Sequence, residues 1–374
     1  MKTEKKIPMS PLYDPWESIY TRQKWGRNIL TSVEFTVTNL CNLRCEHCAV
    51  GDVLTMREST DRIPLELLLR RLDEIENLET ISVTGGEPMY NPSIIKEYIV
   101  PLFQYAHQRG LKTQINSNLT LDLDRYESIL PYLDVLHISF NYLDAESFHK
   151  VAYVHTQHSV SYSQAEKTFQ RMVDNTISLS KMGVFVSAES LISEHTAPVI
   201  SQIHKQISEM GCLRHEVHPL YPSDFARHMK VLSLDELREV YHNLLDNRDP
   251  NLWILFGTLP FYACNEDERD LELIKRIQST PNVTMRNDPD GHNRLNTNIF
   301  NGEVIVTDFG DVEPLGNIKY DRLEDCFEKW QNHSVFKPFN CYCPQSRCNG
   351  PNILVANTYY KEEDFSIKKG IVIP

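Results

Sequence analysis

Three cysteines lie within eight residues, at Cys41, Cys45 and Cys48, with the spacing CxxxCxxC. They follow residues 33–38, a short run that is typical of a β-strand. Three thiols this close together predict one metal site, and iron–sulfur clusters are held by cysteine thiolates. Three protein ligands on a four-iron cluster leave one iron open to a small molecule. A zinc site needs a fourth ligand, and His47 cannot easily turn toward the same ion as its neighbour Cys48, so zinc is the weaker alternative.

A second motif follows the apolar run 80–84. It consists of Gly85, Gly86, Glu87 and Pro88. Two glycines let backbone approach a ligand, and the Glu87 carboxylate can pair with an ammonium group. Alone, this segment would be an ordinary turn. In combination, CxxxCxxC after one strand and Gly-Gly-Glu-Pro after the next resemble the radical S-adenosylmethionine (SAM) superfamily, which usually has an aromatic residue where this chain has His47.

The resemblance implies a fold, cofactors and a reaction. The family has a partial (β/α)6 barrel of the TIM type, in which the three cysteines hold a [4Fe-4S] cluster and SAM chelates the unique iron. The Gly-Gly-Glu-Pro segment binds the SAM amino group through backbone and carboxylate. Reductive cleavage of SAM gives methionine and a 5′-deoxyadenosyl radical, which abstracts hydrogen from a substrate. The electron comes from a donor such as flavodoxin or ferredoxin.

The chain after residue 32 alternates between strand-like and helix-like segments. Strands are predicted at 33–38, 80–84, 112–117, 135–140, 184–191 and 214–220, and helices at 64–76, 92–109, 122–130, 163–182 and 196–210. Six β/α repeats predict an α/β fold with a parallel barrel or most of one. In such barrels the active site lies at the carboxyl ends of the strands.

Polar residues stand at these predicted strand ends. The resemblance implies Ser139 and Asn141 as contacts of the SAM ribose or carboxylate, and Asn116 is a further cofactor-binding candidate. Where the family often has Asp and a later Arg, this chain has Asn141 and Lys150.

Candidates for a catalytic role come from the fifth and sixth strands. They are Glu189, Glu216, His218 and Tyr221. The alternative for each is a hydrogen-bonded turn or strand-end cap, and for His218 a satisfied core histidine.

Four parts are predicted along the chain. They are an N-terminal arm at 1–32, the barrel at 33–230, a helical linker region at 231–297 and an auxiliary-cluster region at 298–374. Within the linker, Ser233 and Glu236 predict a capped helix over 233–246. The last part begins with a hairpin that turns at Asn301-Gly302 and again at 309–311.

A second cysteine cluster follows a helix predicted at 323–330. It has the spacing CxCxxxxC and consists of Cys341, Cys343 and Cys348. Hairpin, helix and cysteines in this order resemble the SPASM or twitch extensions of radical SAM enzymes, which hold auxiliary [4Fe-4S] clusters. The SPASM hairpin supplies a cysteine where this chain has Pro314-Leu315, so one auxiliary cluster is expected rather than two. As a whole, the chain resembles the radical SAM/CxCxxxxC-motif family YfkAB.

The auxiliary cluster needs a fourth ligand, and the candidates are Cys212, Cys264 and Cys326. Cys212 follows Gly211 beside the sixth strand, and Cys326 lies in the predicted helix, so both are expected to be packing residues. Cys264 precedes a polar loop and is our predicted ligand. Zinc on the same four cysteines is the alternative.

Composition narrows the classes of partner. The 374-residue chain has a formal net charge of −13, which argues against a general nucleic-acid or membrane-surface binder. It has no apolar stretch of membrane-spanning length and no signal-like leader, and its nine cysteines cluster as metal sites do, so we expect a cytoplasmic protein. Peptides or small molecules are the expected partners.

Three functions remain open. Redox auxiliary clusters commonly accompany peptide-modifying members of the family, so the resemblance implies oxidation of a peptide or protein side chain. The second hypothesis is a small-molecule or cofactor-biosynthesis reaction. The third is a non-catalytic scaffold that holds structural zinc or iron–sulfur.

Overall fold

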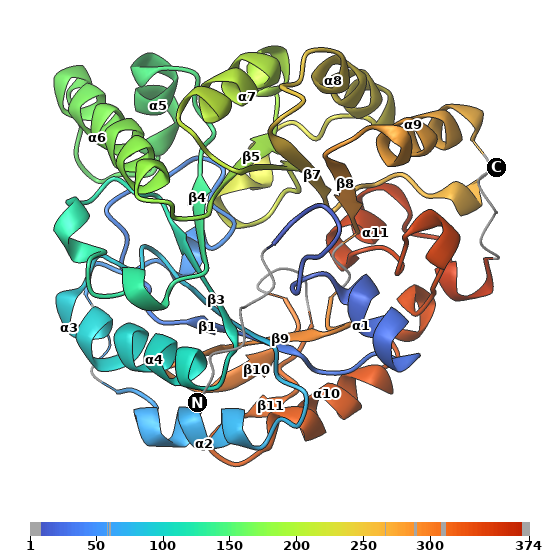
Figure 1. Cartoon of the computed structure of the whole chain (residues 1–374), viewed down its shortest axis with the longest axis horizontal. Helices are drawn as coiled ribbons and strands as arrows, with labels where there is room; N and C mark the ends of the chain where they lie inside the picture. Colours follow the sequence, from blue (N-terminus) through green and yellow to red (C-terminus); the bar gives the residue numbers. More distant parts are fainter. Residues whose placement is uncertain are drawn as a thin grey trace.

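The computed structural model describes residues 9–57, 59, 61–265, 267–287, 290–307 and 312–368. These residues form an 11-stranded sheet that curls into a ring, with most of the helices outside it (Figure 1). The strands are β1 (Ser32–Thr36), β2 (Thr80–Thr84), β3 (Lys112–Ser117), β4 (Val135–Ser139), β5 (Val186–Ile192), β6 (Arg214–Pro219), β7 (Trp253–Gly257), β8 (Val283–Arg286), β9 (Arg294–Asn298), β10 (Glu303–Ile305) and β11 (Gly316–Asn317).

The helices alternate with these strands over most of the chain. They are α1 (Ser18–Trp25), α2 (Leu65–Asp73), α3 (Pro92–Ile94), α4 (Val100–Gln108), α5 (Ala145–Ala152), α6 (Tyr162–Lys181), α7 (Ile200–Glu209), α8 (Leu234–Asp246), α9 (Glu268–Ser279), α10 (Leu323–Gln331) and α11 (Ile353–Tyr359). A π-helical stretch, Ile95–Ile99, joins α3 to α4, because Pro101 lacks the N–H that a regular helix would require there.

The six predicted strands are present as β1 to β6, and each pairs in parallel with the next. The predicted α/β fold with a large parallel sheet is therefore confirmed. Successive side chains of a strand point to opposite faces, so Ile81 and Val83 pack into the main core while Ser82 faces the barrel interior. Register places Gln114 beside Ser82 and Glu189 beside Glu216, which makes the interior polar.

The expected helical linker at 231–297 is wrong in one respect, because it contains three strands of the sheet, namely β7, β8 and most of β9. β7 pairs with β6 and β8 pairs with β7, both in parallel, and α8 and α9 connect them. All five residues of β7 are buried. A short apolar run that is buried on both faces has no alternation, so the sequence does not distinguish it from other core segments.

Other predicted elements differ locally. The predicted helix at 122–130 is replaced by two short 3-10 turns, Leu123–Arg125 and Leu130–Tyr132, since Pro131 cannot continue a helix. The hairpin turn at Asn301-Gly302 is confirmed, but its first strand is β9, which also pairs in parallel with β1. The second turn, at 309–311, lies outside the described residues. The predicted helix at 323–330 is confirmed as α10.

The N-terminal arm enters the barrel interior, where Figure 1 shows it in blue inside the ring. The Trp16 indole N–H donates to the Ser82 hydroxyl at 2.9 Å, and the Asp14 carboxylate pairs with Arg214 at 2.8 Å. Both side chains of the ion pair are 1% exposed. The arm therefore fills space that a helix-covered barrel would otherwise leave open. Within the described residues, we find no helix that combines the length and the apolar character required to span a membrane.

A buried histidine pair joins α7 to β6. The Nδ1 atoms of His204 and His215 lie 2.9 Å apart, and the Asp249 backbone N–H donates to His204 Nε2 at 3.0 Å. Because Nε2 accepts, the His204 proton must sit on Nδ1, where His215 accepts it. Burial lowers the pKa of His204 to about 4 and that of His215 well below its ordinary value. Both rings are therefore neutral near pH 7.

We expect the free energy of unfolding to fall between pH 6.5 and pH 4. In that window the unfolded chain binds a proton at His204 that the folded chain excludes, and a shift from 6.5 to about 4 corresponds to ~3 kcal/mol. Denaturant unfolding across this window should show a shallower pH dependence for His204→Gln than for the wild type. Replacing the exposed His158 by Gln should leave the pH dependence unchanged. Equal slopes for the wild type and His204→Gln would contradict the assignment.

Candidate active site

The first cysteine motif forms a loop directly after β1, the cluster loop (residues 38–48). The Arg44 guanidinium donates to the carbonyls of Cys41 at 2.7 Å and Leu43 at 2.8 Å. The backbone N–H groups of Arg44 and Glu46 donate to the last residues of α5, Ala152 and Val151. Hydrogen bonds from the Arg44 side chain and from two loop amides therefore hold the cluster loop in place against α5.

The three thiols of this loop lie close together and are partly buried. Burial, followed by the neighbouring Cys48 thiol, raises the pKa of Cys45 to about 12. Burial, followed by the nearby Cys45 thiol, raises the pKa of Cys41 as well, and burial raises the pKa of Cys48. Such thiols stay protonated by themselves, whereas a bound metal deprotonates coordinating thiols. Three cysteine side chains on one loop are the donor set that a [4Fe-4S] cluster takes, so the residues present fit that group.

The Gly-Gly-Glu-Pro segment packs directly against the cluster loop. The Gly86 N–H donates to Thr38 O at 2.8 Å, and the Glu87 N–H donates to Leu40 O at 2.7 Å. A Cβ atom on Gly86 would lie 2.2 Å from Leu40 O, and one on Gly85, where φ is +147°, would lie 2.4 Å from Thr38 O. We expected these glycines to admit a ligand. In the structure they admit the backbone of the cluster loop.

Glu87 is fully buried and is bound to the end of β3. Its carboxylate accepts from the Asn118 N–H at 2.7 Å, the Ser117 hydroxyl at 2.9 Å and the Met89 N–H at 3.1 Å. Burial still raises its pKa to about 7. Both oxygens are used within the protein, so the structure gives Glu87 a role in joining β2 to β3, and the SAM ammonium contact stays a prediction. Pro88 is buried in the same turn.

The other predicted cofactor contacts lie at the same ends of the strands. The Asn116 side-chain oxygen accepts from Gln114 at 3.0 Å, and Ser139 is exposed at the end of β4. Asn141 accepts from the Leu191 N–H at 2.6 Å, and its Nδ2 lies 3.3 Å from His47 Nε2. His47, which stands where the family has an aromatic residue, therefore touches a predicted SAM contact.

Three of the four catalytic candidates meet inside the barrel. Glu189 lies 2.8 Å from His137 Nε2, and burial would raise its pKa, yet contact with His137 leaves that pKa below its ordinary value. Its side chain is 32% exposed, so it can exchange a proton with a ligand. Glu216 is buried and pairs with Arg214, Arg286 and His218. Burial would raise the pKa of Glu216, but the two arginines hold it well below its usual range.

Tyr221 lies apart from these three, beside the second group of cysteines. Its hydroxyl donates to Thr258 O at 2.9 Å, and its ring packs in one apolar cluster with Tyr262, Cys348 and Phe365. Cys264, Cys341 and Cys343 pack against the same cluster. Tyr221 is therefore placed next to the second thiol group and not among the carboxylates.

The second thiol group joins two distant segments. Cys343 and Cys348 exchange both backbone hydrogen bonds, at 2.8 and 3.0 Å, and Cys264 lies in the 3-10 turn Ala263–Asn265. Burial, then the thiols of Cys343 and Cys264, raise the pKa of Cys341 to about 12. Burial and then Cys341 raise the pKa of Cys348 well above its ordinary value. All four thiols are thus within electrostatic reach of one another.

The two competing cysteines are elsewhere. Cys212 and Cys326 belong to the main hydrophobic core and are buried. In the described part of the chain, no three His, Cys, Asp or Glu side chains converge as they would around one metal ion.

Comparison with known proteins gives the family. Residues 35–187 match the radical SAM superfamily, and residues 220–370 match a YfkB-like domain. The chain is 53% identical to protein YfkA of Bacillus subtilis (strain 168) over 360 residues, which covers 96% of each chain. The chain belongs to the radical SAM superfamily. Members of this superfamily bind a [4Fe-4S] cluster and SAM.

Solved structures of radical SAM proteins share the fold. Streptococcus suis SuiB bound to its precursor peptide SuiA superposes with a TM-score of 0.61 at 14% identity, covering 100% of this chain and 84% of SuiB. The protein anSMEcpe with bound AdoMet (SAM) gives a TM-score of 0.59 at 14% identity, covering 90% of this chain and 94% of that one.

The structure places further polar side chains beside the cluster loop and the interior carboxylates that were not among our predicted site residues, although Asn118 was noted at the end of a predicted strand. Asn118 Nδ2 lies 3.8 Å from Cys41 Sγ, and the Tyr142 hydroxyl lies 3.6 Å from Cys45 Sγ. His137 was also missed as the partner of Glu189. Asn118 and Tyr142 each follow a predicted strand, and His137 lies two residues before Ser139, on the same face of its strand. Closeness to the carboxyl end of a strand is therefore the sequence feature that could have identified these residues.

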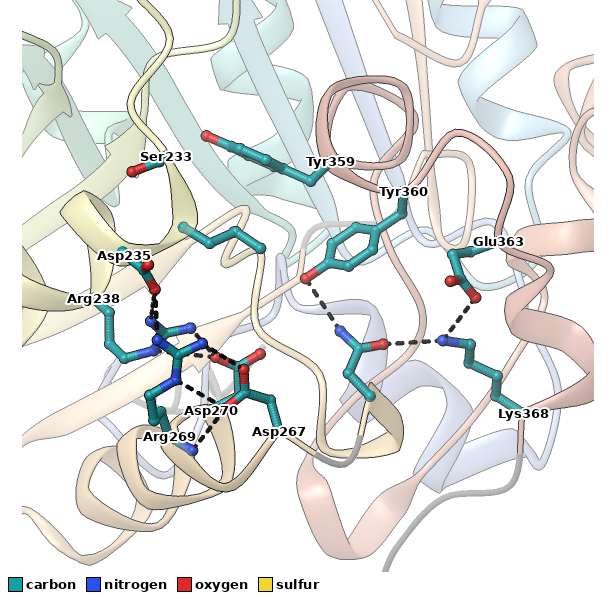
Figure 2. Close-up of a pocket in the computed structure, with 12 residues that line it drawn as sticks. Ser233, Asp235, Arg238, Asp267, Arg269, Asp270, Tyr359, Tyr360, Glu363 and Lys368 are labelled. Atoms are coloured by element: carbon teal, nitrogen blue, oxygen red, sulfur yellow. Dashed lines mark hydrogen bonds and ion pairs between the residues drawn. The ribbon is translucent and has the colours of Figure 1, made fainter.

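A surface pocket of ≈ 560 Å³ lies between the starts of α8 and α9 and the C-terminal residues from Tyr359 to Lys368 (Figure 2). Asn265, the neighbour of Cys264, lines it together with residues of α8, α9 and α11. Its charged groups pair among themselves, including Arg238 with Asp270 at 2.6 Å. Asn265 joins the Tyr360 hydroxyl at 3.1 Å to Lys368 at 3.0 Å. The pocket wall is therefore a satisfied polar network, and we assign it no ligand.

We expect Gly86→Ala to reduce iron binding at the cluster loop while the barrel stays folded. The added methyl group would overlap the Leu40 carbonyl and displace the loop. Iron per chain after anaerobic reconstitution, with far-ultraviolet circular dichroism as the test of folding, measures both effects.

The matched control is Gly183→Ala, which adds a methyl group where nothing lies within 4 Å. Its cost is local backbone strain at φ +83°, so iron binding should be unchanged. Full iron in Gly86→Ala would show that the cluster loop does not depend on this contact.

Proposed function

We propose that this radical SAM protein is an enzyme that cleaves SAM reductively and abstracts hydrogen from a peptide or protein side chain. Cys41, Cys45 and Cys48 would hold the [4Fe-4S] cluster that binds SAM. The observation that carries the proposal is the presence of two separate thiol groups, one after β1 and one beside Tyr221. The first suffices for SAM chemistry, and the second supplies a place for the electron that an oxidation releases.

The protein's own residues would prepare and protect the reaction. When bound, the cluster supplies one electron to SAM, which yields the hydrogen-abstracting 5′-deoxyadenosyl radical. Arg44 and Gly86 hold the cluster loop, while Asn116, Ser139 and Asn141 are our proposed SAM contacts. The polar barrel interior orients the substrate and keeps bulk water away.

Among the interior carboxylates, Glu189 is our proposed proton acceptor. Oxidation of a carbon-centred substrate radical releases one electron and one proton. Glu189 is partly exposed and has His137 as its partner, whereas Glu216 is fully buried between two arginines. His218 and Tyr221 remain catalytic candidates. His218 contacts the Glu216 carboxylate, and Tyr221 donates to the Thr258 carbonyl beside the second thiol group.

The second thiol group would hold an auxiliary [4Fe-4S] cluster on Cys264, Cys341, Cys343 and Cys348. Its proposed role is to accept the substrate electron. Solved structures with the same fold include SuiB with its precursor peptide and anSMEcpe with bound AdoMet and a peptide, which supports a peptide substrate here. A flavodoxin or ferredoxin in the cytoplasm is the proposed electron donor.

A small-molecule substrate is the second candidate. The relative named GTP 3′,8-cyclase from Chlorobaculum tepidum is 31% identical over 128 residues, covering 33% of this chain and 37% of that protein. The AdoMet-dependent heme synthase of Oleidesulfovibrio alaskensis is 23% identical over 323 residues, covering 82% of this chain and 76% of that protein. A zinc-binding scaffold is the third candidate, and metal analysis distinguishes it.

We expect Cys45→Ala to abolish formation of 5′-deoxyadenosine, because each of the three loop cysteines fixes one iron. The assay is anaerobic, with dithionite and SAM, and quantifies 5′-deoxyadenosine by mass spectrometry. Cys212→Ala is the control, since Cys212 is buried in the main core and should leave cleavage unchanged. Formation of 5′-deoxyadenosine at the wild-type rate by Cys45→Ala would contradict the assignment of Cys45 as a cluster ligand.

The same assay separates cleavage from substrate chemistry. Glu189→Gln should still form 5′-deoxyadenosine, but the modified peptide that accumulates with the wild type in cell extracts should be reduced at least tenfold, a general base being worth roughly 10²–10⁴-fold. A modified metabolite in place of a peptide would favour the small-molecule candidate.

We expect about eight irons per chain in the wild type and about four in Cys264→Ala, since the auxiliary cluster would lose a ligand. Cys326→Ala should keep about eight. Iron, sulfide and zinc analysis measures this. Loss of iron in Cys326→Ala but not in Cys264→Ala would identify Cys326 as the fourth ligand. About four irons with one zinc per wild-type chain would contradict the auxiliary iron–sulfur cluster.

A further inference from the structure

The N-terminal arm packs against the CxCxxxxC loop (residues 341–348). The Arg347 guanidinium donates to the Tyr20 hydroxyl at 3.0 Å and lies 3.3 Å from the Glu17 carboxylate. It also lies over the Tyr20 ring, 5.4 Å from the centroid. Glu17 is 2% exposed, and burial, followed by the nearby Asp14, raises its pKa to about 8, so near pH 7 its buried carboxyl group depends on a hydrogen-bonding partner. Arg347 supplies that partner.

The backbone of Arg347 adopts an uncommon conformation. Arg347 has φ of +49°, in the left-handed region that residues with a Cβ atom rarely occupy. This conformation closes the turn in which Cys343 and Cys348 exchange backbone hydrogen bonds at 2.8 and 3.0 Å. The arm therefore contacts the one residue whose strained conformation brings two predicted ligands together.

Further contacts bind the arm on both sides of this turn. The Asn349 side chain donates to the Ser18 hydroxyl at 3.0 Å, in a buried setting. On the other side, Arg22 donates to the Asn340 side chain at 3.0 Å and lies over the Tyr342 ring at 5.1 Å. The N-terminal arm thus contacts this segment before its first cysteine, at Asn340, between its cysteines, at Tyr342 and Arg347, and after its last cysteine, at Asn349.

The other end of the arm is fixed inside the barrel. Asp14 pairs with Arg214 at 2.8 Å and lies 3.8 Å from Arg286, and both arginines bind Glu216. An arm held at both ends cannot move without breaking buried ion pairs. It therefore provides a rigid support for the CxCxxxxC loop, which has little regular structure of its own.

We propose that Arg347 is a positioning residue that holds the CxCxxxxC loop in its ligand-ready conformation by binding Glu17 and Tyr20 of the N-terminal arm. The inference rests on the proposed auxiliary cluster. Arg347 also directly precedes Cys348 in the sequence, and a nearby cation stabilises the more negative, reduced state of a cluster. Arg347 would thus have both a geometric and an electrostatic effect on the site.

The first test measures thiol reactivity in the full chain prepared without iron. Arg347→Gln should raise the alkylation rate of Cys348 at least threefold, as followed by peptide mass spectrometry, because the turn opens. Cys212 and Cys326 in the same chain should react as in the wild type. Arg322→Gln, which removes an exposed arginine of the same C-terminal part, is the matched control. An unchanged Cys348 rate in Arg347→Gln would overturn the inference.

The second test uses the chain with Cys41, Cys45 and Cys48 all replaced by Ala, in which the auxiliary cluster alone would remain. In this background, Arg347→Gln should lower the reduction potential of the cluster, read from a redox titration by electron paramagnetic resonance, while Arg347→Lys keeps the potential near its starting value. An equal potential in Arg347→Gln and the parent chain would overturn the electrostatic part.

The two tests separate the inference from the function on which it rests. A parent chain with no iron would contradict the proposed auxiliary cluster, and the alkylation experiment would still decide whether Arg347 holds the loop. A parent chain with about four irons and an unchanged Cys348 rate would leave the cluster standing and reject Arg347 as its positioning residue.

Discussion

The backbone contact between Gly86 and Leu40 is the constraint on which the predicted SAM site depends. Two glycines let the end of β2 approach the cluster loop so closely that no side chain fits between them. The hydrogen bonds made by the amides of Gly86 and Glu87 then fix that loop relative to the sheet. Glu87 continues the connection to β3 through Ser117 and Asn118. The thiols are thus positioned by the strands as well as by contacts of the loop with itself and with α5.

The barrel interior is stabilised by a different interaction, the pairing of buried charges. Most buried positions in a protein are apolar, but here the inward face carries Glu189, Glu216 and Arg214. Pairing makes this possible, because each charge has a partner of opposite sign or a histidine beside it. The N-terminal arm takes part in that pairing through Asp14. The arm therefore contributes to the pairing of charges inside the barrel as well as filling part of its interior.

How much could be predicted from the sequence depended on the range of each interaction. Local spacing was sufficient for the two cysteine motifs, the strands β1 to β6 and the capped helix α8, in which Ser233 and Glu236 form the expected capping box. Elimination among the spare cysteines placed Cys264 with the second thiol group. The role of the arm could not be predicted, because Asp14 and Arg214 are 200 positions apart and neither has a motif. β7 and β8 were missed because short, fully buried strands lack alternation.

The pairing of β9 with β1 bears on how the chain is made. β1 leads into the cluster loop, and its second neighbour in the sheet, Arg294–Asn298, lies more than 250 positions later in the sequence. During synthesis, β1 therefore remains an open sheet edge until most of the chain has left the ribosome. The parts that match the radical SAM superfamily and the YfkB-like domain share this sheet, so neither can complete it alone. The sheet that carries the cluster loop is thus finished only in a nearly full-length chain.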